Sequence, residues 1–528
     1  MPDKNITETK GRYLLKKGKK GLTRIVFSRI GLIVFLLLLQ LGGFFALLNF
    51  VFDKYLPHYL WTTTVFSVIV IIYLINTDID PTGKITWLIL MMIVPFAGAV
   101  LLLYTQTDFG HRALKRRVSD LTEQTRGYIP QNRSTWRSFE EEHPGGASLA
   151  RYIARSGCYP VFDDTGVTYF SSGEEKFAAL IPELEKAQHF IFLEYFIICE
   201  GLMWSRVLDV LERKVREGVE VRVMYDGTCE FALLPHDYPK RLEALGIKCK
   251  TFSPMTPFLS THYNYRDHRK IAVIDGHTAF TGGINLADEY INHIERFGHW
   301  KDAGIMLKGE AVKSFTLMFL QLWNVSEQKP EFNRYLTYSS PRPDNAGGYV
   351  LPFADCPLDS DKVGERVYMD VLNRAKRYVH IMSPYLILDG EMETALCFAA
   401  ERGVDVAIIL PGIPDKPIPY ALAKTHYKAL LKSGVKIYEY TPGFIHSKVF
   451  VSDDERAVVG SINLDYRSLY HHFECAAFMM DVPCIPDIEA DFRRTVKVCR
   501  QVTEDTVKHE KLKYKVTGAV VKWLAPLL

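Results

Sequence analysis

Two segments of the chain carry the same pattern of polar residues, and this repeat constrains the fold more than any other feature. Each copy reads His-x-Lys-x-x-x-x-Asp, and each continues through six residues into a pair of small residues, one further residue and an asparagine. A single His-x-Lys occurs by chance in most long proteins, whereas two copies with one internal spacing do not. The first copy contains His268, Lys270, Asp275 and Asn285, and the second contains His446, Lys448, Asp453 and Asn463.

The motif histidines lie 178 residues apart (from 268 to 446), which is the size of a domain and not of a short structural repeat. In both halves, apolar strand-like runs alternate with segments of helical periodicity before the motif is reached. We therefore predict an α/β fold made by internal duplication, with two halves packed about a pseudo-twofold axis. The expected strands are 166–170, 189–198, 219–224, 378–383 and 404–410, and the expected helices are 174–187, 208–217, 368–376 and 391–402.

Three apolar stretches near the N-terminus, 30–52, 59–76 and 86–104, are each close to the roughly 20 residues that cross a bilayer as a helix. Their lack of internal charge argues against a buried hairpin of a soluble protein, and a cleaved signal peptide would not be followed by two more such stretches. We therefore expect N-terminal transmembrane helices and a membrane-integral, multi-pass protein. Basic residues on both sides of the region prefer the cytoplasm, which three full crossings cannot satisfy, so two or three crossings remain open.

These features divide the chain into seven expected parts. They are a basic N-terminal tail (1–24), a transmembrane region (25–105), a polar linker (106–150), the first α/β half (151–333), a connection (334–352), the second α/β half (353–500) and a C-terminal tail (501–528). The C-terminal tail combines lysines, a tryptophan and terminal leucines. This composition fits a membrane-surface segment and an ordinary helix packed on the domain equally well.

Composition excludes several classes of site. The net charge is only +3, and no basic stripe interleaved with aromatic residues lies outside the membrane flanks, so we expect no nucleic-acid partner. The nine cysteines include no CxxC pair, which indicates reduced thiols rather than a disulfide framework or a zinc site. Unpaired cysteines favour a cytoplasmic catalytic region. No carboxylates are clustered as metal ligands, so we expect neither a metal nor another cofactor.

The motifs have the residue types that a phosphodiester reaction needs. Along a strand alternate side chains share one face, so His268 and Lys270 point the same way, as do His446 and Lys448. Lysine supplies charge for a phosphate, asparagine supplies a neutral donor, and imidazole can attack phosphorus or donate a proton. Two such sets around one anion suit a two-step displacement through a covalent phospho-histidine. The two motif aspartates lie at the far end of the strand, where we expect them to secure the turn.

The repeated motif resembles the HKD motif of the phospholipase D superfamily over residues of about 150 to 500. The resemblance implies that His268 is the nucleophile and His446 the general acid, and it counts Asp275 and Asp453 with the active site. It also implies that an acidic residue beyond the asparagine orients each histidine. Glu474 fits this role in the second copy and Asp302 in the first, with Glu289 as a competitor of Asp302.

Within the superfamily, the chain resembles bacterial cardiolipin synthases. The similarity lies in the N-terminal apolar stretches, the runs 87–104 and 189–196, the segment Asn463-Leu464-Asp465-Tyr466-Arg467-Ser468 and the C-terminal Trp523-Leu524-Ala525-Pro526-Leu527-Leu528. It implies a bacterial cell-membrane enzyme that converts two phosphatidylglycerol molecules into cardiolipin and glycerol. A third apolar stretch departs from the two spans typical of these enzymes. The alternatives are a phospholipase D that hydrolyses the same intermediate, a membrane-tethered nuclease and a non-enzymatic scaffold; intact motifs in both copies argue against the scaffold.

Overall fold

The computed structural model describes residues 56–77, 79–93, 98–103, 112–254, 265–338 and 341–527, together with Leu38, Gly42, Gly43 and Ala46. The expected basic tail and most of the first apolar stretch (30–52) lie outside the described residues.

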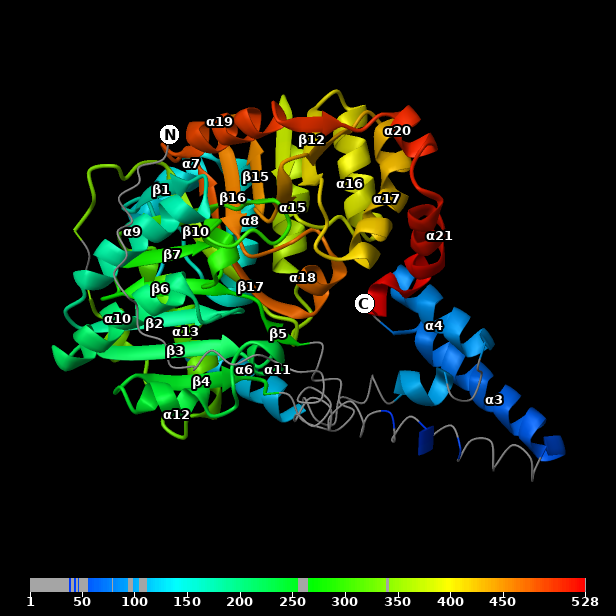
Figure 1. Ribbon diagram of the computed structural model, residues 1–528, viewed down its shortest axis with the longest axis horizontal. Coiled ribbons are helices and arrows are strands. Elements are labelled where there is room, and N and C mark those ends of the chain that lie inside the picture. The colour runs from blue at the N-terminus through cyan, green and yellow to red at the C-terminus, as the bar shows by residue number, and fades with distance from the viewer. Residues whose placement is uncertain are drawn as a thin grey trace.

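Two β-sheets form the centre of the molecule, and the order of their strands is the same (Figure 1). The first sheet runs β1 (Gly166–Phe170), β9 (Gly304–Lys308), β7 (Thr278–Gly282), β6 (Lys270–Ile274), β2 (Phe190–Tyr195), β3 (Glu220–Asp226) and β4 (Lys248–Phe252). The second sheet runs β10 (Tyr349–Asp355), β17 (His472–Met480), β16 (Arg456–Gly460), β15 (Val449–Ser452), β11 (Tyr378–Met382), β12 (Asp405–Pro411), β13 (Lys436–Tyr440) and β18 (Cys499–Gln501).

The strands correspond one to one, apart from the added edge strand β18 and the short strand β5 (Arg266–Asp267), which pairs with β17. Their directions correspond as well, because β2, β3 and β4 are parallel, as are β11, β12 and β13, and the remaining equivalent pairs are antiparallel. An identical order with identical directions confirms the internal duplication. The motif strands β6 and β15 occupy the same place in their sheets, so the two histidines that precede them are structurally equivalent.

Helices cover the sheets, and one of them lies between the two halves. Helix α13 (Val312–Trp323) contacts β2, β6 and β7 of the first sheet and β10 of the second. All of its residues except Lys313 are buried, as expected for a helix that is apolar on nearly every side. The other helices of the halves are α9 (Gly173–Glu185), α10 (Leu202–Arg216), α11 (Cys229–Ala232), α12 (Tyr238–Glu243), α14 (Asn333–Leu336), α15 (Val363–Arg374), α16 (Gly390–Glu401), α17 (Pro417–Lys432), α18 (Tyr466–Tyr470) and α19 (Ile485–Val496).

The segment 106–150 differs from the expected polar linker. Its described part forms α6 (Arg112–Gln124), α7 (Arg133–Glu142) and the start of α8 (Pro144–Gly157), which contribute buried apolar side chains such as Leu121 and Phe139 to the main core. Each helix is polar except for a narrow apolar stripe, which is why composition alone suggested a linker. The expected connection 334–352 likewise ends inside β10, whose backbone pairs with β17 from Tyr349 onward.

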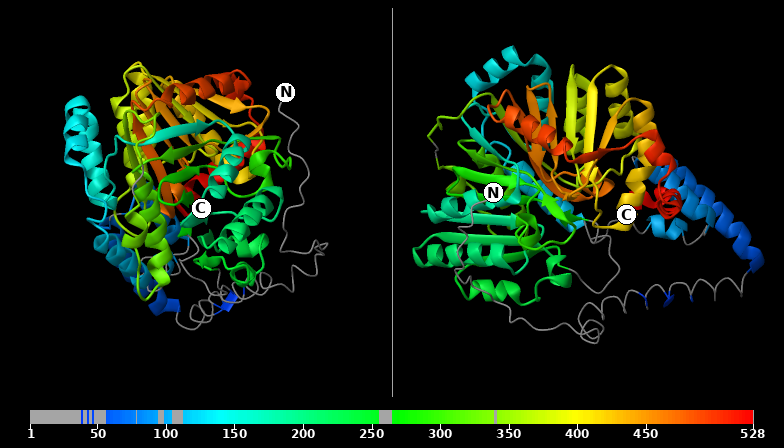
Figure 2. Two further views of the ribbon diagram at one scale, coloured as in Figure 1. Left: turned by 90° about the vertical axis from the view of Figure 1, so that its left-hand side faces the viewer. Right: turned by 45° about the horizontal axis from the view of Figure 1, so that its top comes forward.

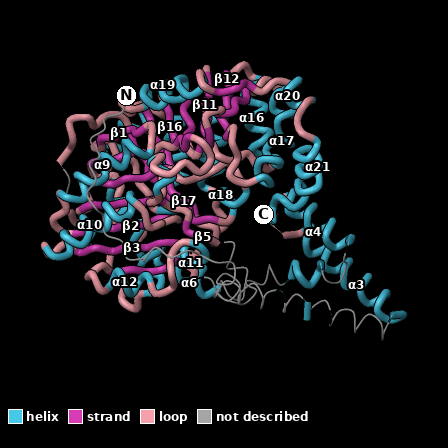
Figure 3. The backbone as a smooth tube through the Cα atoms, viewed as in Figure 1, coloured by secondary structure: helices cyan, strands magenta, loops and turns pink. Residues whose placement is uncertain are grey.

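The N-terminal helices and the C-terminal tail lie side by side at one end of the molecule (Figures 1 and 2). Helices α3 (Leu56–Ile75) and α4 (Pro81–Ile93) project from the body next to α21 (Leu512–Val521) and the 3-10 helix η4 (Lys522–Leu527), as Figure 3 also shows. Helix α20 (Glu504–Lys508) lies further along the tail, where it contacts α17. In the part of the chain that the structure describes, no helix has the length and apolarity needed to span a membrane. Residues 86–93 of the expected span 86–104 belong to α4, and residues 94–97 and 104 lie outside the described residues.

Candidate active site

Each motif histidine follows a short strand that pairs with the opposite half of the molecule. Strand β5 (Arg266–Asp267) pairs with β17, and the backbone N–H of His268 donates to Phe473 O at 2.9 Å. Strand β14 (Gly443–Ile445) pairs with β8 (His299–Lys301), and the backbone N–H of His446 donates to Lys301 O at 2.7 Å. The backbone exchange is reciprocal, and it brings both histidines to the interface between the halves.

The acidic partners of the histidines are exchanged in the same way. His268 Nδ1 lies 2.8 Å from Glu474 Oε1, and His446 Nδ1 lies 2.7 Å from Asp302 Oδ2. Sequence order suggested that each acid serves the histidine of its own copy, and this pairing was wrong. Both acids are completely buried, and each fixes the tautomer of its histidine by accepting from Nδ1, which leaves Nε2 for chemistry. The competitor Glu289 instead pairs with Arg296 at 2.9 Å.

The motif lysines are buried beside these histidines. Lys270 Nζ donates to the carbonyl oxygen of His268, and Lys448 Nζ donates to that of His446 and lies 2.9 Å from its Nδ1. Burial lowers the pKa of Lys270 to about 8 and that of Lys448 to about 7. A bound anion would strongly stabilise the charged form of these buried ammonium groups, because little water is present to solvate them.

Both histidines are neutral in this environment. Burial is the main reason that the pKa of His268 lies well below its ordinary value, and Lys270, Lys448 and His446 lower it further by their charge. Burial and Lys448 lower the pKa of His446 to about 4, although the charge of Asp302 opposes them. The two motif histidines and the two motif lysines are therefore close enough to interact electrostatically. The neutral His268 has a lone pair on Nε2 available for attack.

The two motif asparagines have different surroundings. Asn285 Oδ1 accepts from Ile197 N at 3.0 Å, and its Nδ2 donates to the Tyr290 hydroxyl at 2.7 Å. Asn463 is also buried, and its Oδ1 has no hydrogen-bond partner among the described residues. Asn285 is therefore held in place by its neighbours, while the carbonyl of Asn463 remains available.

The motif aspartates bind backbone and not the histidines. Asp275 accepts from the N–H groups of Gln188, His189 and Phe190 at 2.7 to 2.8 Å. Asp453 does the same at the equivalent place, accepting from Lys376, Arg377 and Tyr378 at 2.8 to 3.0 Å. Both aspartates also have a positive φ at the end of their strand. They anchor the turn after the motif strand to the strand beside it.

Several residues around the site carry no signal in the motif. Phe196 and His472 lie 4.8 and 5.3 Å from the ring centre of His268, and Trp300 and Tyr290 lie 5.3 and 5.4 Å from that of His446. These rings surround the two imidazoles and exclude water from them. His472 lies in β17, two residues before Glu474, and Trp300 lies in β8, two residues before Asp302. Aromatic residues next to these two acids in the sequence were therefore the available signal.

Lys176 is a third buried lysine next to the site. Its ammonium has no hydrogen-bond partner among the described residues and lies 5.9 Å from the ring centre of Tyr195. Burial lowers its pKa to about 8, Asp302 raises it, and Lys270 lowers it by repulsion. Lys176 shares the buried face of α9 with Leu180 and Leu184 at helical spacing, and this pattern was the available sequence signal.

Two groups of three side chains in the described part of the chain have the spacing of a metal site. One comprises Glu365, Asp389 and Glu391, and Lys362 lies 3.7 Å from Glu365. The other comprises His268, His472 and Glu474. The second group fits a cation poorly, because Lys270 and Lys448 already place positive charge there and Glu474 is engaged with His268 and the Ser461 hydroxyl. Its charges suit an anion such as a phosphate.

Comparisons with known proteins identify a family and several similar chains. The family model described as "Cardiolipin synthase, PLD-like domain" matches residues 180–323 and 368–496. An uncharacterized protein of Streptococcus mutans is 57% identical over 87% of this chain and 99% of its own. A protein named cardiolipin synthase from a Geobacillus species is 34% identical over 88% of this chain and 92% of its own. The crystal structure of phosphatidylserine synthase from Haemophilus influenzae has the same fold, with a TM-score of 0.54 and 15% identity over 69% of this chain and 93% of its own.

Proposed function

Because the chain belongs to the cardiolipin synthase family of the phospholipase D superfamily, and is therefore a phosphatidyltransferase, we propose that its substrates are two phosphatidylglycerol molecules and its products cardiolipin and glycerol. The observation that carries this proposal is the reciprocal exchange at the interface. It puts two neutral histidines, each oriented by a buried acid, beside two buried lysines. The positive charge of two such sets suits a single phosphodiester.

In the first step, His268 Nε2 attacks the phosphorus of the donor phosphatidylglycerol. The N–P bond forms while the bond from phosphorus to the glycerol oxygen breaks, and protonated His446 gives its proton to that oxygen. Lys270 and Lys448 stabilise the charge on the phosphoryl oxygens. The first product is glycerol, and the phosphatidyl group stays on His268.

In the second step, a hydroxyl of the acceptor phosphatidylglycerol takes the place that glycerol left. His446, now neutral, accepts the hydroxyl proton while the new O–P bond forms and the N–P bond breaks. Cardiolipin leaves, His268 is regenerated, and His446 carries the proton for another cycle. The aromatic side chains around both histidines keep water away from the intermediate, since hydrolysis would give phosphatidic acid.

Substrate binding supplies the protonated His446 that the first step needs. The free site holds His446 neutral because of burial and the nearby Lys448. A bound phosphodiester brings a negative charge close to the imidazole, and this charge raises the pKa of His446. Binding of the anion and uptake of the proton are therefore coupled.

The enzyme acts at the bacterial cell membrane, where its lipid substrates are. Large apolar side chains are exposed on three neighbouring helices at one end of the molecule. They are Val65, Val68, Ile69, Ile72, Tyr73 and Ile75 of α3, Ile85, Met92 and Ile93 of α4, and Leu512, Val516 and Val520 of α21. A surface of this size in water would be costly, and contact with lipid removes that cost.

The test is product analysis of the purified, detergent-solubilised protein with phosphatidylglycerol as the only lipid. We expect cardiolipin and glycerol in equal amounts, and neither product from His268→Ala or His446→Ala. His236→Ala is the matched control, because this exposed histidine pairs with Glu230 and is not part of the motifs, so its loss should leave the rate unchanged. Phosphatidic acid without cardiolipin would make the protein a hydrolase and refute the transferase reaction.

A further inference from the structure

A cavity of about 470 Å³ lies between α17, α18 and the C-terminal η4. One part of its wall is apolar and includes Ile418, Leu422 and Ala525. The other part carries the charged side chains of Lys416, Arg467 and Asp465. The cavity thus combines an apolar compartment with a cationic end, as the acyl chains and the phosphate of a phospholipid require.

The charged end of this cavity borders the catalytic groups. Asp465 follows Asn463 by two residues, and its charge acts on Lys448. Lys416 acts electrostatically on His268. Tyr385 lines the cavity, and its ring centre lies 6.5 Å from that of Phe444. The Phe444 ring centre in turn lies 5.9 Å from that of His446.

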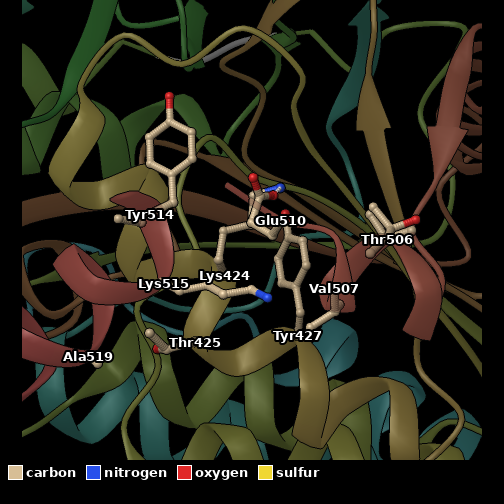
Figure 4. A pocket seen from close by; sticks show the side chains of 11 residues that line it. Lys424, Thr425, Tyr427, Thr506, Val507, Glu510, Tyr514, Lys515 and Ala519 are labelled. Carbon is tan, nitrogen blue, oxygen red and sulfur yellow. Dashed lines mark ion pairs between the residues drawn. The ribbon is translucent and has the colours of Figure 1, made fainter. Parts of the chain in front are cut away.

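The C-terminal tail completes the apolar wall and links it to the N-terminal helices. Thr86 of α4 donates to Trp523 O at 2.5 Å, and Gly83 lies against Pro526. Helix α21 is held on α17 at Gly518, where an added Cβ would come within 2.5 Å of Ala421 O. Figure 4 shows the neighbouring contact between these elements, where Lys424 pairs with Glu510 at 2.9 Å. The cavity is therefore built beside the surface that we assign to the membrane.

We propose that this cavity is the subsite for the acceptor lipid, an anionic glycerophospholipid whose phosphate lies near Lys416 and Arg467 and whose acyl chains begin along Ile418, Leu422 and Ala525. This inference rests on the proposed function and specifies where the second substrate binds. The acceptor hydroxyl would then reach the phosphorus from the charged end of the cavity.

The order of bond changes explains why the cavity suits the acceptor. In a two-step displacement the acceptor hydroxyl approaches from the side that the glycerol left, and this side faces His446, the group that gives and takes the proton. The contacts through Tyr385 and Phe444 and the effect of Asp465 on Lys448 all place the cavity next to His446 and its lysine. The donor headgroup, glycerol, needs no apolar compartment on that side.

The experiment separates the acceptor from the donor by using labelled glycerol. Enzyme with phosphatidylglycerol and labelled glycerol should form labelled phosphatidylglycerol by reversal of the first step, and this exchange needs no lipid acceptor. The variant Ile418→Trp fills the cavity, and the side chain it replaces is 43% exposed, so the core is not disturbed. Lys416→Glu reverses a charge on an exposed side chain. Val498→Trp and Lys428→Glu are the matched controls, at exposed positions outside the cavity.

The measured quantity is the ratio of cardiolipin formed to glycerol exchanged. We expect Ile418→Trp and Lys416→Glu to lower this ratio by about tenfold or more, which corresponds to a loss of about 1.4 kcal/mol of acceptor binding. Both controls should keep the wild-type ratio. An unchanged ratio in Ile418→Trp and Lys416→Glu would overturn the assignment of the cavity. Wild-type protein that gives neither exchange nor cardiolipin would instead refute the proposed function itself.

Discussion

Replacing Asp302 by asparagine tests both the exchanged pairing and the role of His446. The Asp302 carboxylate is completely buried 2.7 Å from His446 Nδ1, and asparagine keeps its shape and its bond from Ala303 N. With charge centres about 4 Å apart and an effective dielectric constant of about 20, the carboxylate favours protonated His446 by about 4 kcal/mol. This energy corresponds to about three pKa units. Proton donation to the leaving glycerol should therefore slow by about 10² to 10³.

The assay compares two donor lipids that differ only in the leaving group. Glycerol must be protonated as it leaves, whereas p-nitrophenolate leaves without a proton. Asp302→Asn should release glycerol from phosphatidylglycerol slowly and yet give a first burst of nitrophenolate from phosphatidyl-p-nitrophenol at nearly the wild-type rate. Glu474→Gln should slow both leaving groups alike, because Glu474 orients the nucleophile His268. If Asp302→Asn slowed both leaving groups equally, the pairing of Asp302 with a general acid would be wrong.

Three further predictions follow from buried charge. Because Lys448 and Lys270 must be protonated to bind phosphate, kcat/KM should fall as pH rises past their pKa values of about 7 and about 8. Arginine stays protonated in this pH range, so Lys448→Arg should abolish the loss of activity near pH 7. The ratio of variant to wild-type kcat/KM should therefore rise above pH 7, and a constant ratio would contradict this. Asp453→Ala leaves three backbone N–H groups without an acceptor and should cost about 3 kcal/mol or more in urea unfolding, while Asp453→Asn should cost less. Lys176→Met removes an ammonium that has no hydrogen-bond partner among the described residues, so it should leave the Tm unchanged or raise it, whereas a fall of several degrees would show that the charge is compensated.

The sequence was sufficient to predict the architecture of the two halves. The strand expected at 166–170 has those bounds in the structure, and the expected helix 391–402 differs from α16 by one residue at each end. These predictions succeeded because apolar periodicity and the repeated motif agreed with each other. The helices α6 to α8 were missed because only a few of their side chains enter the core, so a polar composition concealed them.

The motif residues of the candidate site could be named from sequence, but their partners could not. Sequence separation from each histidine suggested which acid belonged to it, and the separations of 28 residues for Glu474 and 34 for Asp302 gave no sign that the pairs cross over. The pairing depends on how the halves pack, and packing is set by surfaces far from the motif. Lys176 was missed because a single lysine on a helix is usually exposed, and its burial follows from the position of α9 against Gly304.

The exchange of strands and acids explains why the duplication is needed for chemistry. Within one half, His268 would lack the acid that orients it, and His446 would likewise lack Asp302. Neither half contains both the nucleophile and the proton donor, and neither holds the two lysines that together offset the phosphate charge. The site therefore exists only where the halves meet, and any motion that separates them removes the nucleophile's orientation and the anion site at once. The buried helix α13, packed on both sheets, opposes that separation and so supports catalysis without touching the substrate.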